Sequence, residues 1–222
     1  MRPSVLLPLA AHVPAVAVAY GIPRRLSRTD AAALTFDDGP HPEGTPAVLD
    51  ALDAAGAKAT FFLMGEQVER RPELAREIAV RGHAVGVHGY RHTLLLRRTR
   101  RGLADDLDRA ASLIADATGV QPVHYRAPYG VFSTASLELA RVHGWMPLLW
   151  SRWGRDWERR ATGEAIARRS VRRLTGGDVV LLHDADYYSS AGSWRRTVEA
   201  LPEILAAGST LGLSWVPVTQ ET

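Results

Sequence analysis

The sequence of 222 residues contains no cysteine, one lysine and no clean apolar run of the length that crosses a membrane. Without cysteine, the chain has no disulfide bond, no thiolate metal ligand and no cysteine nucleophile. Lys58 is the only lysine, so arginine supplies nearly all of the positive charge, and the net charge is +3. We interpret the recurrent arginine pairs as solvated helix surface, with a polyanionic partner as the alternative. Because a recognised nucleic-acid motif and interleaved aromatic residues are lacking, we expect no nucleic-acid partner.

The first twenty residues are the most apolar segment, and they contain only one early arginine. This composition is loosely similar to a signal peptide. Three prolines and His12 interrupt the segment, however, and it falls short of the ~20 clean apolar residues of a membrane span. We expect no stable membrane span, and the location of the protein, cytoplasmic or associated with the cell envelope, stays open.

Short apolar runs alternate with amphipathic stretches along the rest of the chain. The runs predict seven strands, namely Ala31–Phe36, Ala59–Met64, Ala84–His88, His124–Arg126, Pro147–Trp150, Val179–His183 and Ser214–Val216. The amphipathic stretches predict helices over Thr45–Ala55, Pro72–Arg81, Leu103–Thr118, Thr134–His143, Gly163–Leu174 and Trp194–Ala206. This alternation predicts a parallel sheet with helical crossovers, either a barrel or an open doubly wound sheet. In both architectures functional groups gather at the carboxyl ends of the strands.

Polar residues stand at these strand ends. Asp37 and Asp38 follow the first strand, and two adjacent carboxylates repel each other unless a positive group holds them. His88 and His92 are four residues apart, a spacing that puts both imidazoles on one face of a helical turn. Two histidines and a carboxylate with open positions suit a zinc hydrolase or a mononuclear iron oxygenase. The strand–helix alternation favours the hydrolase, because such oxygenases are usually double-stranded β-helices.

Three further residues extend this set. Arg126 ends a strand, and it is either a surface residue or a cation that keeps a carboxylate ionised. His183 is either a core histidine with satisfied hydrogen bonds or an acid whose pKa a carboxylate such as Asp156 raises. Four other histidines have no such companions, and we expect them to be structural, namely His41, His83, His124 and His143.

Five motifs, in this order, resemble those of the polysaccharide deacetylases of carbohydrate esterase family 4, the NodB-homology domain. They are Thr35-Phe-Asp-Asp-Gly-Pro40, His88-x-x-x-His92, Arg126-x-Pro-Tyr-Gly130, Asp156-Trp157 and Leu181-x-His183. The resemblance covers about residues 31–217 and implies a distorted (β/α) barrel with about seven parallel strands. It divides the chain into residues 1–28, an apolar segment that is signal-like or a packed extension, and residues 29–222, the deacetylase domain.

The resemblance also implies the chemistry and the role of each matching residue. The activity would be hydrolysis of an N-acetyl group on a sugar or glycan, which releases acetate with the help of a divalent metal, usually zinc. The implied metal ligands are Asp38, His88 and His92. The implied catalytic residues are Asp37 as base, His183 as acid, Arg126 and Asp156 as their respective partners, and Tyr129 as the backbone donor to the oxyanion. The implied walls of the acetyl pocket are Pro128, Trp157 and Leu181.

The sequence departs from the family pattern at three places. Gly89 stands where a serine or threonine is usual, and Trp153 stands where many members have an aspartate. Tyr187–Ser193 forms an unusual polar and aromatic loop whose tyrosine rings are suited to stacking on sugars, whereas Trp194 either stacks in the same way or starts the next helix and packs into the barrel wall. Two alternatives remain, a catalytically inactive carbohydrate-binding domain and a related C–N hydrolase that acts on a small-molecule amide.

Overall fold

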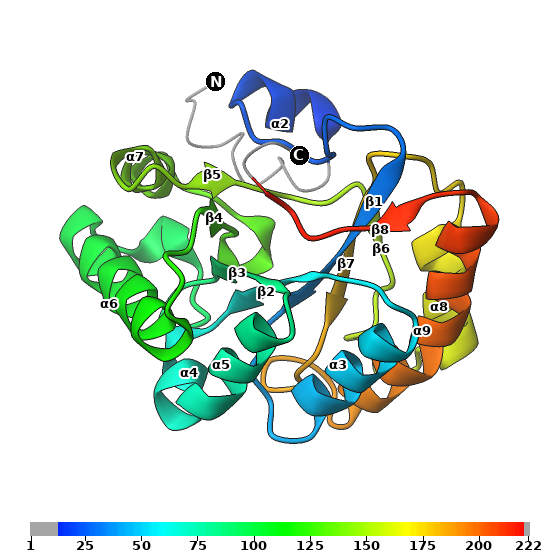
Figure 1. The fold of residues 1–222 in the computed structure, drawn as a ribbon. Coiled ribbons are helices and arrows are strands. Elements are labelled where there is room, and N and C mark those ends of the chain that lie inside the picture. The colour runs from blue at the N-terminus through cyan, green and yellow to red at the C-terminus, as the bar shows by residue number, and fades with distance from the viewer. Residues whose placement is uncertain (1–12, 220–222) are drawn as a thin grey trace.

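Eight short strands form one sheet in the computed structural model, which describes residues 13–219 (Figure 1). They are β1 Ala31–Asp37, β2 Thr60–Leu63, β3 Ala84–Val87, β4 His124–Tyr125, β5 Met146–Pro147, β6 Arg152–Trp153, β7 Val179–His183 and β8 Ser214–Trp215. Seven strands follow the order β5-β4-β3-β2-β1-β7-β6, and β8 pairs with β1. Every pairing of these strands is parallel. The predicted distorted barrel is confirmed, and it is open between β5 and β6, the two ends of the strand order.

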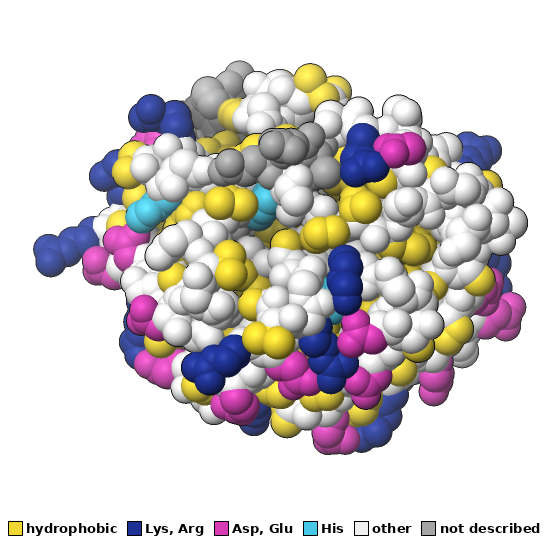
Figure 2. All heavy atoms as spheres, in the orientation of Figure 1, with side chains coloured by type: hydrophobic (Ala, Val, Ile, Leu, Met, Phe, Trp, Pro, Cys, Tyr) yellow, Lys and Arg dark blue, Asp and Glu magenta, His cyan; other side chains and the backbone are white. Residues whose placement is uncertain are grey.

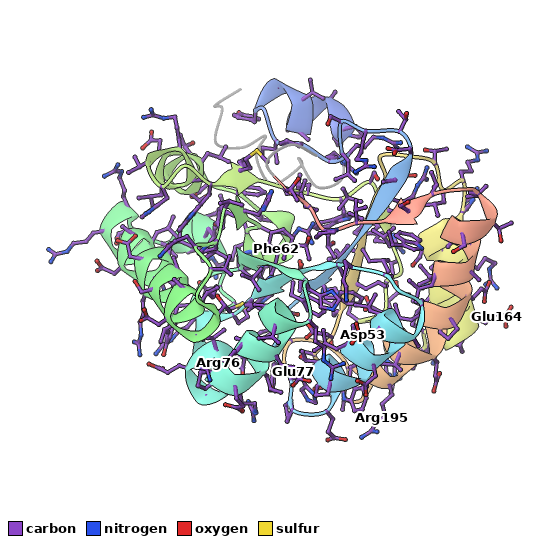
Figure 3. All side chains as sticks on the ribbon, viewed as in Figure 1. Asp53, Phe62, Arg76, Glu77, Glu164 and Arg195 are labelled. Atoms are coloured by element: carbon purple, nitrogen blue, oxygen red, sulfur yellow. The ribbon has the colours of Figure 1, made fainter. Side chains whose placement is uncertain are left out.

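Helices cover the outside of this curled sheet (Figure 1). Their bounds are α2 Pro14–Ala19, α3 Gly44–Ala54, α4 Gly65–Arg70, α5 Pro72–Val80, α6 Arg100–Thr118, α7 Thr134–Val142, α8 Gly163–Val171 and α9 Ser193–Thr210. Two short 3₁₀ helices, η2 Leu95–Arg97 and η3 Pro128–Gly130, lie in the loops after β3 and β4. Figure 3 shows Phe62 within the sheet, whereas Glu164 and Arg195 lie at the outer rim of the helical layer.

Sequence and environment agree most closely in β1 and α6. All seven residues of β1 are buried, because β2 and β7 flank the strand and helices cover it, and such a strand needs an unbroken apolar run. In α6 the side chain of Thr99 accepts a hydrogen bond from the Gly102 N–H, and Gly119 ends the helix in the left-handed conformation (φ 73°). These two elements help to position the site, because β1 ends in Asp37 and α6 packs beside β3.

The structure differs from the sequence predictions at the opening of the barrel and at one short helix elsewhere. The segment Pro147–Trp150 was expected to be a strand, but β5 ends at Pro147 and the unpredicted strand β6 begins at Arg152. The reason is that the carbonyls of Leu148 and Leu149 accept hydrogen bonds from the Arg126 side chain rather than from a neighbouring strand. Helix α4 was also not predicted, since its six residues are too few to establish a helical period.

The described part of the N-terminal segment packs on the domain. Ala17 and Ile22 are buried, and the Leu26 N–H donates to the Gly177 carbonyl at 2.8 Å. Residues 1–12 lie outside the described residues, so the boundary at residue 28 stays a prediction. Among helices within residues 13–219, none is long and apolar enough to cross a membrane.

Asp178 joins this segment to the sheet, and we predict that its removal destabilises the fold. Its buried carboxylate pairs with Arg25 and with Arg152, and it accepts hydrogen bonds from Ser151 and from the Thr175 N–H. Asp178→Ala leaves these donors without their acceptor, so the free energy of unfolding should fall by about 2–4 kcal/mol. Urea denaturation measures this loss. The control is Asp108→Ala, which removes a surface partner of His143 and should unfold near the wild-type midpoint. A wild-type midpoint for Asp178→Ala would contradict the anchoring role of Asp178.

Candidate active site

A cavity of about 370 Å³ opens where β1, β3 and β7 end. Eight of the eleven residues that the sequence assigned to the site line it, namely Asp37, Asp38, His88, His92, Tyr129, Trp157, Leu181 and His183. The other three lie behind the wall: Arg126 and Asp156 contact lining residues, and the buried Pro128 precedes Tyr129. Parallel strands bring these residues together because their carboxyl ends meet at one edge of the sheet.

Asp38, His88 and His92 converge at the floor of the cavity. Asp38 Oδ1 lies 3.5 Å from His88 Nε2 and 3.4 Å from His92 Nε2. This oxygen is buried and has no hydrogen-bond partner among the described residues, which is unfavourable unless a cation occupies the space. His88 Nδ1 lies 2.8 Å from the Arg126 carbonyl, which can only accept a hydrogen bond. The His88 proton therefore lies on Nδ1, and the lone pair of Nε2 is free to bind a metal.

The protonation states of two of these residues also suit a metal. Burial opposes ionisation of Asp38, but its interaction with His88 and the charges of His183 and His92 lower its pKa to about 2. Burial lowers the pKa of His92 to about 4. At neutral pH the carboxyl of Asp38 is therefore ionised and the imidazole of His92 is neutral, as metal ligands must be. The donor set of one carboxylate and two imidazoles fits a divalent ion with open coordination positions.

Asp37 is held from behind by Arg126. The fully buried guanidinium donates to Asp37 Oδ1 at 2.8 Å and to Thr35 Oγ1 at 2.9 Å. It also lies over the Phe62 ring, 4.1 Å from the ring centroid. This ion pair fixes the direction of the carboxylate, since the planar guanidinium is itself bound on several sides. The other oxygen, Asp37 Oδ2, lies 3.8 Å from His88 Nε2 on the cavity side.

His183 is held in the same way by a carboxylate. Asp156 Oδ1 lies 2.9 Å from His183 Nδ1, and Asp156 Oδ2 accepts from the His183 N–H and from Thr197 Oγ1. Burial alone would lower the pKa of His183, but the charge of Asp156 and its hydrogen bond raise this pKa to about 10. His183 is therefore protonated at neutral pH, and its Nε2 faces the cavity 4.0 Å from Asp38 Oδ2.

Aromatic rings form the walls. Trp150, Trp153 and Trp157 line one side, so the tryptophan that replaces a frequent aspartate makes this wall apolar. Tyr188 also lines the cavity and stacks on His92, with ring centroids 4.3 Å apart. The expected sugar-stacking role was too broad: Tyr187 and Trp194 pack against His41 and do not line the cavity.

Sequence reasoning missed two supporting residues, Asp106 and Thr197. Asp106 Oδ2 accepts from the Tyr90 N–H at 2.8 Å and Oδ1 accepts from Arg98 at 3.2 Å, so α6 holds the loop between His88 and His92. Gly89 adopts φ 106° in this loop, a conformation that disfavours the serine or threonine usual in the family. One signal pointed to Asp106: it is an acid within the apolar stripe of α6, beside Leu103 and Leu107. No local signal identified Thr197, which reaches Asp156 from α9 across 41 residues of sequence.

Comparisons with known proteins agree with this geometry. Residues 25–148 match the family described as polysaccharide deacetylase. The chain is 33% identical to a chitooligosaccharide deacetylase of Azorhizobium caulinodans, over 83% of this chain and 91% of the relative. It is 34% identical to a peptidoglycan-N-acetylglucosamine deacetylase of Bacillus cereus, over 85% of this chain and 86% of the relative.

Solved structures give the same relationship. A family 4 carbohydrate esterase from Streptomyces lividans, in complex with acetate, superposes with a TM-score of 0.78 at 28% identity, covering 88% of this chain and 96% of that chain. A family 4 pseudoenzyme from Bacillus anthracis has the same TM-score at 24% identity, covering 86% of this chain and 65% of that chain, and it shares the fold alone. The matched motif region and the identity to curated relatives together show that this chain belongs to the polysaccharide deacetylase family, carbohydrate esterase family 4.

Proposed function

We propose that the chain is an active, metal-dependent N-deacetylase that hydrolyses the acetamido group of an acetylated sugar or glycan and releases acetate. One observation carries this proposal: a carboxylate held by a buried cation and a histidine held by a buried carboxylate face one cavity, on either side of three candidate metal ligands. Hydrolysis of an amide needs this combination of a base for water and an acid for the leaving nitrogen.

Asp38, His88 and His92 would hold the ion, which we propose to be zinc. When bound, a divalent ion lowers the pKa of water and polarises the carbonyl of the substrate. Asp37 takes the proton of the attacking water, because Arg126 binds one oxygen of its carboxylate and leaves the other on the cavity side. His183 then donates a proton from Nε2 to the departing nitrogen, while Nδ1 stays bound to Asp156.

The remaining assigned residues position the substrate in this proposal. The N–H of Tyr129 donates to no other group among the residues that the structure describes, and it would bind the oxyanion that develops on the acetamido oxygen. Trp157 and Leu181 line the apolar side of the cavity and would enclose the acetyl methyl group. Pro128 supports Tyr129 from the buried side. Relatives named for chitooligosaccharide and for peptidoglycan N-acetylglucosamine support acetylated glucosamine glycans as the substrate class.

An inactive carbohydrate-binding domain is the alternative, since a pseudoenzyme shares the fold. The buried pairing of both Asp37 and His183 argues against it, because a site that has lost its chemistry has no need to keep two buried charges in place. Acetate release from acetylated glucosamine oligosaccharides, measured with and without added zinc after chelation, tests the proposal. Zinc-dependent release supports it, and the absence of release with zinc bound contradicts it.

The two adjacent aspartates should behave differently on substitution. Asp38→Asn should weaken zinc binding itself, because Asp38 supplies the carboxylate ligand. Asp37→Asn should keep the metal and lose about 10²-fold or more in kcat, as expected when a general base is removed. Elemental analysis and kcat on the same preparations measure both effects. Equal loss of zinc in the two variants would refute this division, and His92→Ala serves as the reference for loss of a ligand.

The pH dependence should reveal the pairing of His183 with Asp156. His183 acts as an acid, so activity falls as the pH rises through its pKa, which Asp156 raises to about 10. Asp156→Asn removes the raising charge and leaves the burial that lowers this pKa, so the alkaline limb of kcat/KM should move to lower pH. Glu158→Gln removes a carboxylate that contacts Arg155 and Arg169 instead, and it should leave the limb in place. An unmoved limb in Asp156→Asn would disprove the pairing.

Asp106 should matter for metal affinity although it is not a ligand. Asp106→Asn keeps the size of the side chain but weakens its hold on the Tyr90 N–H and on Arg98. Loss of a residue that orients ligands weakens metal binding by about 10–100-fold, and we expect a loss toward the lower end. Competition with a zinc chelator measures the dissociation constant. Asp105→Asn, an exposed neighbour on α6, is the matched control, and equal affinity in the two variants would exclude a positioning role for Asp106.

A further inference from the structure

Two hollows of about 300 and 220 Å³ lie beside the active-site cavity at the open edge of the barrel. Trp153 lines both of them and also lines the cavity that contains His183. Their walls contain five arginines, which we call the arginine groove: Arg152, Arg155, Arg169, Arg172 and Arg173. These residues come from β6, from the loop that follows it and from the end of α8, so the fold rather than the local sequence assembles the groove.

Few carboxylates balance this charge. Glu158 contacts Arg169 at 3.0 Å and Arg155 at 3.5 Å, and the buried Asp178 contacts Arg152 at 3.0 Å. Arg172 and Arg173 are both exposed, and neither forms an ion pair with a carboxylate within residues 13–219. Five arginines face two carboxylates, one of which also pairs with Arg25, so the groove has a surplus of at least three positive charges.

Several arginines elsewhere on the surface are paired with carboxylates. Arg81 contacts three carboxylates, and Arg109 and Arg195 each contact a glutamate. On the face shown in Figure 2, basic and acidic side chains lie next to one another along the lower rim. The groove differs from these regions because its arginines gather around two hollows that share Trp153 with the active-site cavity.

Protection of a sheet edge accounts for only part of the groove. A charged residue on an edge strand prevents pairing with another chain, and Arg152 on the edge strand β6 suits that role. Arg172 and Arg173 follow α8 and project from a different element, and a sheet edge gives them no reason to gather in the same hollow. A shared anionic ligand does, because several guanidinium groups around one hollow repel each other until an anion binds.

We propose that the arginine groove binds a carboxylate or phosphate group carried by the same glycan whose acetylated sugar occupies the active-site cavity. This inference rests on the proposed function and narrows its substrate class to acidic glycans. Guanidinium groups bind both kinds of anion with paired, charge-assisted hydrogen bonds. Trp153, with the Arg155 guanidinium 5.0 Å from its ring centroid, lies between the two sites and offers an apolar face to the intervening sugar.

The test compares matched tetrasaccharides of N-acetylglucosamine: the neutral one, one oxidised to a carboxylate at C6 of a terminal sugar, and one phosphorylated there. The wild-type protein should have a lower KM for both acidic substrates, with similar kcat, because the groove binds a part of the substrate that does not react. The Arg172→Gln/Arg173→Gln variant should raise the KM for acidic substrates about tenfold, the effect of losing ~1.4 kcal/mol of binding. Its kcat and its KM for the neutral substrate should not change.

A matched control separates the groove from the general charge of the protein. Arg159→Gln/Arg160→Gln removes the same charge from an exposed pair nearby that lines neither hollow. It should leave the preference for acidic substrates intact, and higher salt should reduce that preference in the wild-type protein. Equal loss in both double variants would assign the preference to the overall field and overturn the proposal.

The remaining outcomes distinguish this inference from the proposed function. Zinc-dependent acetate release from the neutral substrate, without any preference for acidic substrates, would refute anion binding by the arginine groove and would still support the deacetylase activity. If no substrate releases acetate, calorimetric titration with the carboxylated tetrasaccharide tests anion binding by the groove on its own. The proposal is supported if the carboxylated form binds more tightly than the neutral form and Arg172→Gln/Arg173→Gln loses this difference. Binding a single-stranded oligonucleotide more tightly than either acidic glycan would assign the groove to nucleic acid and overturn the proposal.

Discussion

The buried contact between Arg126 and Asp37 is the constraint on which the rest of the site depends. A guanidinium without exposure to solvent needs an anion and several acceptors, since leaving one partner of such a pair alone costs about 3–5 kcal/mol. Arg126 obtains these partners from β1, where Asp37 and Thr35 lie, and from the carbonyls of Leu148 and Leu149. The pair thus joins the first strand to the far edge of the sheet, and it directs one oxygen of Asp37 toward the cavity.

Arg126 also contacts the segment at the opening of the barrel. The carbonyls of Leu148 and Leu149 accept hydrogen bonds from Arg126, and this segment is not part of a strand. The chain next joins the sheet at β6, which pairs with β7. The edge that results exposes Arg152 and Trp153, and α8 brings further arginines to it. The charged hollow therefore lies at this open edge, beside the active-site cavity.

Two side chains that face the cavity are each paired with a buried group of opposite charge. Asp37 is an anion held by a cation, and His183 is held protonated by an anion, so each functional group is fixed by a buried partner that faces away from the cavity. Environments that stabilise opposite charges on two neighbouring groups are typical of an acid and a base that work in one reaction. The three candidate metal ligands lie near both, and Asp38 Oδ1 has no hydrogen-bond partner among the described residues.

The sequence by itself indicated most of the residues that line the cavity, because short apolar runs predict strands and polar motifs at their ends predict where functional groups meet. It also determined the parallel, barrel-like class of the fold. The tertiary structure alone decided that Pro147–Trp150 is not a strand, since Arg126 competes for its carbonyls from a distant part of the chain. It also decided that Tyr188 rather than Tyr187 faces the cavity, and that Asp106 and Thr197 support its residues. These are long-range contacts, and a local pattern of hydrophobicity carries no information about which distant side chain will satisfy a buried polar group.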